Sequence, residues 1–436
     1  MRQDKTESAQ LLDFLQEQIA IPSVKGEAAA GAPFGPETVR ALEHFLQRAE
    51  QDGFRTGRLD GYAGYIEFGP EEAREMVAAV CHLDVVPPGD WEEAFCPEIR
   101  GEELVGRGSA DDKGPAVAVY FALRRLQAQA YQAQRRIRLI LGLDEESGSA
   151  CMAHYRSHGE IPVAAFTADA DFPVIHAEKG LLQVAFSFPA ETLRSAQGKR
   201  LLEAAAGTRP NVVPDRCSLS FEGREVVEIL GKAAHASTPD EGQNAIARAF
   251  SDLGLEGETE GKGLAAFIRD CASDTTGSGL GVAVRDEVSG ALTFNAAVLH
   301  YDQQGARLVC DLRYPVTLAG QELSQRMAER VAQYGGSFEL LHDSLPLYLA
   351  EDHPLVAGLL EVYQRLSGEE ARPLAIGGGT YARSLPNTVA FGSVFPGEVV
   401  LMHQRGESCN IPNLLRSVDY YEEALKCLDQ LDMGRA

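Results

Sequence analysis

Apolar residues in the first third of the chain follow two repeating patterns. Short continuous apolar runs at 76–81, 137–143 and 163–167 are typical of strands that are buried on both faces of a sheet. Apolar residues at helical spacing occupy the segments before and between these runs. Strands that alternate with helices indicate an α/β sheet of mixed or parallel order. The predicted helices cover 11–20, 38–49, 112–128 and 146–157.

A different pattern begins near residue 180. Stretches such as LLQVAFSFPA and RCSLSFEG alternate apolar and polar residues, as antiparallel strands with one solvated face do. Helical spacing recurs between such stretches, so we expect an α+β block. Its predicted helices cover 244–253, 264–272 and 318–334.

The α/β pattern returns after residue 347, with predicted helices at 354–367 and 412–431. A chain of 436 residues exceeds the size at which one hydrophobic core keeps growing. We therefore predict one domain built from 1–179 and 348–436, with a second domain inserted at 180–347.

The net charge indicates which partners to expect, and the cysteines indicate the compartment. The formal net charge is −24, and a strongly acidic chain repels nucleic acid and anionic membranes, so we expect neither as a partner. The N-terminal segment lacks an apolar stretch behind a basic one, and no apolar run approaches the length that spans a membrane. Eight cysteines without CxxC spacing favour buried thiols in a reducing compartment, and we expect a cytoplasmic protein.

Acidic and histidine side chains gather where the predicted strands end. In open α/β sheets, ligands bind at the carboxyl ends of strands. A single such cluster is more typical of a helix N-cap or a partner of the helix dipole. Four clusters in one crevice would repel each other unless a cation offset their charge. The clusters are His82 with Asp84, Asp111 with Asp112, Glu145 with Glu146, and Asp169 with Asp171.

The chemistry of these side chains indicates a metal centre. Carboxylates mixed with imidazoles suit zinc, manganese or cobalt. Two such ions about 3.5–4 Å apart can share a bridging carboxylate and activate one water molecule.

A set of motifs in chain order carries a family resemblance. They resemble the aminoacylase/carboxypeptidase family of two-metal peptidases, and most of all its dipeptidase V branch. The resemblance covers nearly the whole chain and implies a zinc-peptidase-like catalytic domain, with a central mixed sheet flanked by helices. It also implies that the inserted block at 180–347 is an α+β lid. The motifs are HLDVVP, GRGSADDKGP, LDEESG, TADADFPVIHAEKG, GKAAHASTP, DLRYP, GGGTYAR, LPNTVAFGSVFPG and MHQRGE.

The resemblance implies a role for each residue of the metal centre. Asp84 would orient the imidazole of His82 without binding metal itself. In the family, the peptide bond after the bridging aspartate, here Asp111–Asp112, is cis. The implied ligands are His82 and Asp169 for the first metal, Glu146 and His403 for the second, and Asp111 as the bridge between them.

Catalysis and substrate binding are implied in the same way. Glu145 resembles the general base that takes a proton from water and passes it to the leaving amine. His235 resembles the lid histidine that stabilises the oxyanion. The remaining implied substrate contacts are Asn211 and Arg313 of the lid, and Gly378, Gly379 and Thr380, whose turn offers backbone N–H groups to a terminal carboxylate.

The expected activity is hydrolysis of dipeptides that have a free N-terminus. It would depend on two divalent metal ions, with zinc favoured and manganese or cobalt as alternatives. The same machinery could instead release the acyl group of N-acyl amino acids, and a non-catalytic metal-binding relative is a third hypothesis. In the dipeptidase V branch an enlarged lid replaces a partner chain, so we expect a monomer in which His235 acts in cis.

Overall fold

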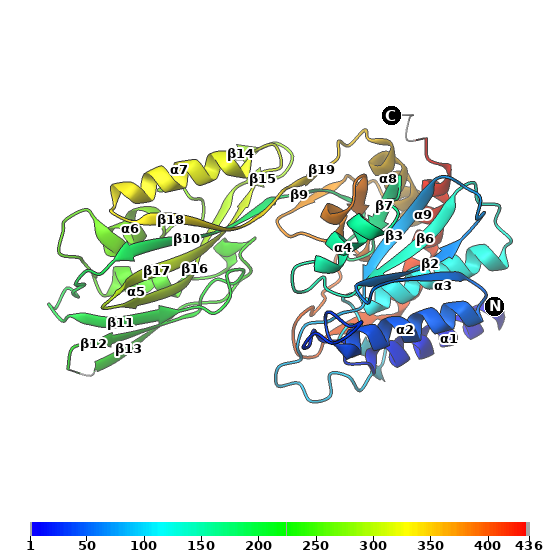
Figure 1. Cartoon of the computed structure of the whole chain (residues 1–436), viewed down its shortest axis with the longest axis horizontal. Coiled ribbons are helices and arrows are strands. Elements are labelled where there is room, and N and C mark those ends of the chain that lie inside the picture. Colours follow the sequence, from blue (N-terminus) through cyan, green and yellow to red (C-terminus); the bar gives the residue numbers. More distant parts are fainter. Residues whose placement is uncertain (1, 224, 433–436) are drawn as a thin grey trace. The chain divides into compact units, whose positions relative to one another are not determined.

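A computed structural model describes residues 2–223 and 225–432, which fold into two compact units (Figure 1). The first unit contains the chain up to His176, then Leu349–Leu374, and the segment from Gly379 onward. The second unit consists of Ala177–Tyr348 together with Ala375–Gly378. Residues 375–378 therefore group with the inserted unit, although the sequence pattern placed them in the flanking domain.

The first unit is built on a mixed sheet. Its strand order is β1-β2-β6-β3-β7-β21-β9-β19, and β20 also pairs with β9. The sheet continues into the segments that join the two units. The strands are β1 (Arg55–Leu59), β2 (Ala63–Phe68), β3 (Met76–His82), β6 (Arg136–Gly142), β7 (Ala164–Thr167), β9 (Ile175–Glu178), β19 (Leu347–Tyr348), β20 (Leu374–Ile376) and β21 (Thr388–Ala390).

The central position of β3 follows from its sequence. All seven residues of MVAAVCH are buried, because a strand with a layer on each face needs apolar side chains on both. β3 pairs in parallel with β6 and with β7, whereas β2 runs antiparallel to β6. The expected α/β architecture with a mixed sheet is confirmed.

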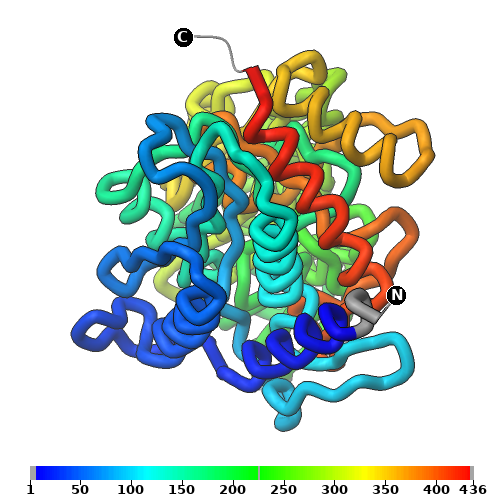
Figure 2. Tube along the Cα trace, turned by 90° about the vertical axis from the view of Figure 1, so that its right-hand side faces the viewer, coloured from blue at the N-terminus to red at the C-terminus, as the bar shows by residue number. Residues whose placement is uncertain are grey.

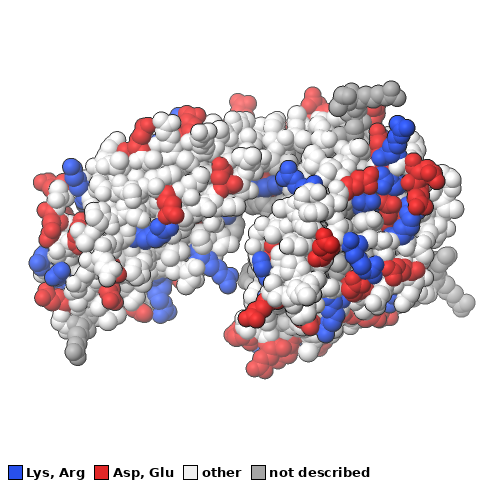
Figure 3. Space-filling model, viewed as in Figure 1, with Lys and Arg blue, Asp and Glu red and all other residues white. Residues whose placement is uncertain are grey.

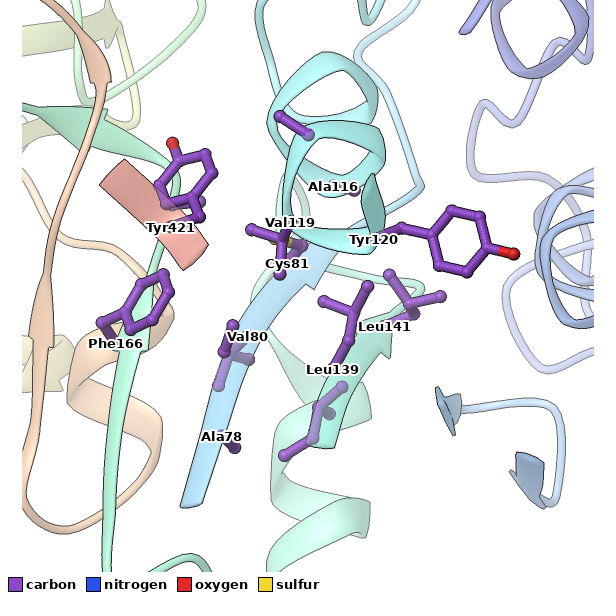
Figure 4. Packing of buried hydrophobic residues seen from close by; sticks show 14 of the residues in the cluster. Ala78, Val80, Cys81, Ala116, Val119, Tyr120, Leu139, Leu141, Phe166 and Tyr421 are labelled. Carbon is purple, nitrogen blue, oxygen red and sulfur yellow. The ribbon is translucent and has the colours of Figure 1, made fainter. Parts of the chain in front are cut away.

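Helices cover this sheet. α2, α1, α3, α9 and α8 pack in a row in that order, and Figure 2 shows α9 beside α3. α3 and α9 also contact β3, and Val119 of α3 joins Val80 of β3 in one packed cluster (Figure 4). The helices are α1 (Arg2–Ile19), α2 (Pro36–Gln51), α3 (Lys113–Ala128), α4 (Ala150–His158), α8 (Pro354–Ser367), α9 (Ile411–Gln430) and the short η2 (Tyr381–Ser384).

Two small sheets complete the first unit. β23 (Ser408–Asn410) pairs with β5 (Glu103–Val105), which pairs with β4 (Glu98–Arg100). β22 (Ser393–Val394) pairs with β8 (Ala170–Asp171). The first of these sheets joins the chain that precedes Asp111 to the chain that follows His403.

The second unit has its own sheet and its own core. Antiparallel strands run in the order β13-β12-β11-β16-β17-β10-β18, and helices pack on them around a separate apolar cluster. This arrangement confirms the expected α+β character. Its elements are β10 (Gly180–Pro189), β11 (Leu201–Ala206), β12 (Arg216–Phe221), β13 (Glu225–Leu230), η1 (Pro239–Glu241), α5 (Ala245–Asp252), α6 (Gly263–Cys271), β14 (Arg285–Asp286), β15 (Gly290–Ala291), β16 (Thr293–Asp302), β17 (Gly305–Tyr314), α7 (Gly320–Gln333) and β18 (Ser337–Ser344).

One helix begins later than its sequence predicts. The helix expected over 146–157 starts at Ala150. Backbone N–H groups of the preceding segment donate to acidic side chains, because Glu145 and Glu146 donate to Asp84 while Ala150 donates to Asp144. These bonds hold the start of the predicted helix as a turn.

The surface carries charges of both signs. On the face seen in Figure 3, Lys and Arg are interspersed with Asp and Glu. Across the described residues, each helix is too short or too polar to cross a membrane.

Candidate metal centre

Three parallel strands bring the predicted ligands to one edge of the sheet. β3 ends at His82, which pairs with Gly142 at the end of β6. On the other side of β3, Val80 pairs with Thr167, the last residue of β7. Glu146 follows β6 and Asp169 follows β7, so the register places both beside His82. This is the edge at which open α/β sheets bind ligands.

Asp111 lies between two histidines. Its Oδ1 atom is 2.9 Å from Nε2 of His82, and its Oδ2 atom is 2.8 Å from Nε2 of His403. Asp169 approaches the first histidine, with Oδ2 3.7 Å from its Nε2 atom. Glu146 approaches the second, with Oε2 3.1 Å from its Nε2 atom. One carboxylate thus faces two separate groups of donors.

These side chains fit a pair of divalent ions. His82, Asp111 and Asp169 form one group of ligand atoms within 4.8 Å of one another, and Asp111, Glu146 and His403 form a second. Oxygen and imidazole donors suit zinc, manganese or cobalt. The buried Oε1 atom of Glu146 has no hydrogen-bond partner in the described part of the chain. An unsatisfied buried carboxylate oxygen is costly, and a cation would satisfy it. The bond Asp111–Asp112 is cis, as expected.

The carboxyl groups of Asp169, Glu145 and Glu146 are hard to ionise without a cation. Burial raises the pKa of Asp169 to about 7, and the charge of Asp111 adds to the rise. Burial also raises the pKa of Glu145 and that of Glu146. Hydrogen bonds to Asp111 and Glu146 raise the pKa of His403 to about 10. In the metal-free protein, protons therefore supply the positive charge that metal ions would otherwise bring.

Hydrogen bonding fixes the tautomer of His82. Its Nδ1 atom lies 2.9 Å from the main-chain oxygen of Asp84, which can only accept, so Nδ1 carries the hydrogen. Nε2, which faces Asp111, is then the nitrogen that would bind a metal once it has lost its proton. The imidazole is completely buried. The Asp84 carboxylate lies farther from the ring, with Oδ1 3.5 Å from Nδ1.

The Asp84 carboxylate makes its hydrogen bonds to another segment. Oδ1 accepts the N–H of Glu145 at 3.0 Å, and Oδ2 accepts the N–H of Glu146 at 3.2 Å. Asp84 therefore ties the end of β3 to the turn that carries the predicted base and one predicted ligand. The sequence suggested contact between Asp84 and the imidazole, but it contained no signal for this backbone contact.

Two predicted lid residues, Asn211 and His235, lie on neighbouring segments of the second unit. Val212, next to Asn211, forms an antiparallel bridge with His235. The N–H of Ala236 donates to the main-chain oxygen of Asn211 at 2.9 Å. The N–H of Ser237 donates to Nδ1 of His235 at 3.3 Å. The Ser237 Oγ atom lies 2.6 Å from the same nitrogen, so Ser237 holds this face of the ring.

Arg313 is engaged within the second unit. Its Nε and Nη2 atoms donate to Asp311 at 2.7 and 3.3 Å, and Nη1 donates to the Gly377 oxygen at 3.0 Å. The planar fork expected to bind a substrate carboxylate thus faces Asp311. Arg313 also holds the glycine turn that leads to Gly378. Beyond that turn, the Thr380 hydroxyl oxygen caps η2 by accepting the N–H of Ala382.

Two residues near Asp111, Arg107 and Glu407, were given no role from the sequence. Glu407 is fully buried, and it pairs with buried Arg107, whose Nη1 atom lies 2.6 Å from Oε2. The Arg107 guanidinium lies 5.6 Å from the centre of the Trp91 ring. Both residues fall within the quoted motifs, but nothing in the sequence links side chains 300 positions apart.

Comparison with known proteins shows to which family the chain belongs. Residues 78–426 match peptidase family M20/M25/M40, a span that includes every predicted metal ligand. The chain belongs to this family. As an M20-type enzyme it is a hydrolase of the metallopeptidase class, which confirms the family expected from the motifs.

Individual known proteins match this chain over nearly their full length. The protein "Putative dipeptidase YtjP" of Bacillus subtilis (strain 168) is 37% identical over 95% of this chain and 96% of its own. Aminoacylhistidine dipeptidase from Vibrio alginolyticus has the same fold, with a TM-score of 0.63, 17% identity, and coverage of 95% of this chain and 96% of its own. The YXEP protein of Bacillus subtilis, described as a dinuclear metal-binding peptidase of the M20 family, has a TM-score of 0.57 and 12% identity over 97% of this chain and 99% of its own.

Proposed function

We propose that this M20-family chain hydrolyses the peptide bond of dipeptides that carry a free N-terminus, using two divalent metal ions. The observation that carries the proposal is the position of Asp111, which directs one carboxylate oxygen to each of two ligand groups. Relatives that match along nearly the whole chain are named dipeptidases, and this supports the substrate class.

The metal ions would be held by the side chains that converge on this edge. His82 and Asp169 would hold one ion, Glu146 and His403 the other, and Asp111 both. Bound there, the ions would polarise the scissile carbonyl and lower the pKa of a water molecule. Zinc suits this mixture of carboxylates and imidazoles, and manganese and cobalt suit it as well.

Glu145 is proposed as the general base. Its partly buried carboxylate leaves the turn next to Glu146, and burial raises its pKa above that of an ordinary glutamate. A raised pKa suits a group that takes a proton from the attacking water and then gives it to the leaving amine. The N–H bond from Glu145 to Asp84 holds the backbone of this residue in place.

Residues of the inserted unit, together with Gly379 and Thr380 of the first unit, are proposed as substrate contacts. His235, whose Nδ1 atom contacts Ser237, would donate a hydrogen bond to the oxyanion. Asn211, on the neighbouring segment, would hold the substrate. Arg313, Gly378, Gly379 and Thr380 would recognise the terminal carboxylate.

A comparison of two substrates tests the proposal. The purified, metal-loaded protein should cleave Ala-Leu much faster than N-acetyl-leucine, because a dipeptidase site binds the free α-amine. A faster rate on N-acetyl-leucine would replace dipeptidase with N-acyl amino acid deacylase. No turnover of either substrate with both metals bound would favour a non-catalytic relative, although Glu145 and all five proposed ligands are present in the sequence.

We further propose a cytoplasmic monomer in which His235 acts within its own chain. Solution scattering should give the mass of one chain, 47.1 kDa. Mixing an inactive His235→Ala variant with an inactive Arg313→Ala variant should not restore activity. A dimer whose mixed variants regain turnover would contradict this expectation.

A further inference from the structure

Glu407 accepts several hydrogen bonds from the loop that carries Asp111. Its Oε1 atom accepts the N–H groups of Gly108, Ala110 and Asp111 at 3.0, 3.1 and 3.2 Å. Its Oε2 atom accepts Nη1 of Arg107 at 2.6 Å. Both oxygens of a fully buried carboxylate are therefore satisfied by the residues that lead to the bridging aspartate.

The backbone around Glu407 is joined to the same loop. The N–H of Gly106 donates to the main-chain oxygen of Glu407 at 3.0 Å. One residue further on, Ser408 pairs with Val105 in the ladder between β23 and β5. Gly108 has a φ of +85°, which favours glycine, and this lets the loop turn around the carboxylate.

Glu407 also lies close in sequence to another proposed ligand. His403 precedes it by four residues, and the described chain between them forms turns. Nε2 of His403 is 2.8 Å from Oδ2 of Asp111. Glu407 therefore joins the loop of the bridging ligand to the segment that carries the second histidine.

We propose that Glu407 is a positioning residue for the metal centre, which holds Asp111 and His403 in register without contacting a metal. A ligand set that is already in place binds metal more tightly than one that must be ordered on binding. Arg107 balances the buried charge of Glu407, so the pair is needed as a unit. The proposal rests on the metal centre of the proposed function.

The test compares Glu407→Gln with a matched control. Glu67 and Arg138 form another buried ion pair in the first unit, between β2 and β6, with Oε2 accepting Nη2 at 2.6 Å and Nε at 3.0 Å. Glu67→Gln breaks a pair of the same chemistry that contacts none of the proposed ligands. Each full-length variant is titrated with Mn²⁺ alone in a calorimeter, below its own unfolding temperature.

We expect Glu407→Gln to weaken Mn²⁺ binding by about 10–100-fold, as loss of groups that orient ligands does, and Glu67→Gln to leave the affinity unchanged. Equal affinities for Glu407→Gln and the unmodified protein would overturn the proposal, as would equal losses in both variants. If Glu407→Gln does not fold, Glu407→Asp replaces it. That side chain keeps the charge but is too short to reach both Arg107 and the loop, so it should also weaken binding, and unchanged affinity would again overturn the proposal.

The readout needs no substrate, so the two proposals can fail separately. Metal binding that depends on Glu407 in a protein without dipeptidase activity would remove the proposed function and leave this role intact. If the protein cleaves dipeptides and Glu407→Gln keeps full Mn²⁺ affinity, the role of Glu407 is overturned and the proposed function stands.

Discussion

At the scale of single residues, adjacent acids at the metal edge differ in what they contact. The Oε2 atom of Glu146 lies 3.1 Å from Nε2 of His403. Glu145 belongs to neither group of candidate ligand atoms, and its pKa is raised by burial. Two neighbouring side chains on one turn can therefore have different roles. Glu146 would bind a metal, and Glu145 would accept a proton.

Amide substitutions of the two glutamates should fail in different ways. Glu145→Gln keeps the size and the metals but cannot accept a proton, so turnover should fall by about 10²–10⁴-fold or more while metal content stays at two. Glu146→Gln replaces a charged ligand with a neutral one, so its metal content should fall toward one. Metal analysis beside turnover of both variants decides between the roles. Loss of metal from Glu145→Gln, with two metals kept in Glu146→Gln, would reverse the assignment.

Proton release should accompany metal binding. His403, with its pKa raised to about 10 by its hydrogen bonds to Asp111 and Glu146, holds a proton at pH 7 when no metal is bound. Ligation requires the neutral ring, so the proton leaves and affinity should rise with pH above pH 7. His82, whose pKa is raised by Asp111 and Asp84, must release a proton in the same way. Below pH 7 the rise should be steeper, because Asp169, with its pKa raised to about 7 by burial, must also lose a proton.

Calorimetric titration with Mn²⁺ at pH 6, 7 and 8, in buffers that differ in their heat of protonation, measures this release. A heat that is the same in every buffer, together with an affinity that does not change with pH, would contradict the assignment of His403 as a ligand.

At the scale of elements, the hydrophobic pattern predicted the buried strands well, but it did not predict the contacts between loops. The run at 76–81 became Met76–His82, and the run at 163–167 became Ala164–Thr167, because continuous apolar stretches have few alternatives to a buried strand. The turn before α4 was missed, since two of its hydrogen bonds go to Asp84, which follows β3 and is far away in the sequence. The clusters at strand ends were visible, but only the sheet order brings them together.

The role of Asp84 can be measured by a double-mutant cycle on Mn²⁺ affinity. If Asp84 acts by holding the backbone of Glu146, Asp84→Asn should cost little further affinity in a Glu146→Gln background. In a His82→Asn background, its full effect should remain. The opposite pattern, with coupling to His82 alone, would return Asp84 to the role of orienting the imidazole.

At the scale of the whole molecule, the two units have separate apolar cores, and all five proposed ligands belong to the first. The length and the change of pattern near residue 180 predicted two domains. The assignment of residues 375–378 to the second unit could not be predicted, because it depends on tertiary contacts such as the one between Arg313 and Gly377.

Metal should therefore stabilise only part of the chain. A ligand that binds the folded form alone adds about 4 kcal/mol of stability when its free concentration is 1,000 times its Kd. We expect scanning calorimetry to show one transition that falls in temperature on chelation and another that does not move. Glu146→Gln should reduce the shift. Transitions that all stay in place after complete removal of metal would contradict the convergence of these five residues.

The position of Trp91 gives this molecule a built-in optical reporter. It is the single tryptophan of the chain, it is 6% exposed, and it lies against Arg107. Indole fluorescence from the entire chain therefore comes from one place, next to the ion pair that we propose aligns the metal loop. A change in that pair can be followed as a shift in emission, in real time and in the unlabelled protein.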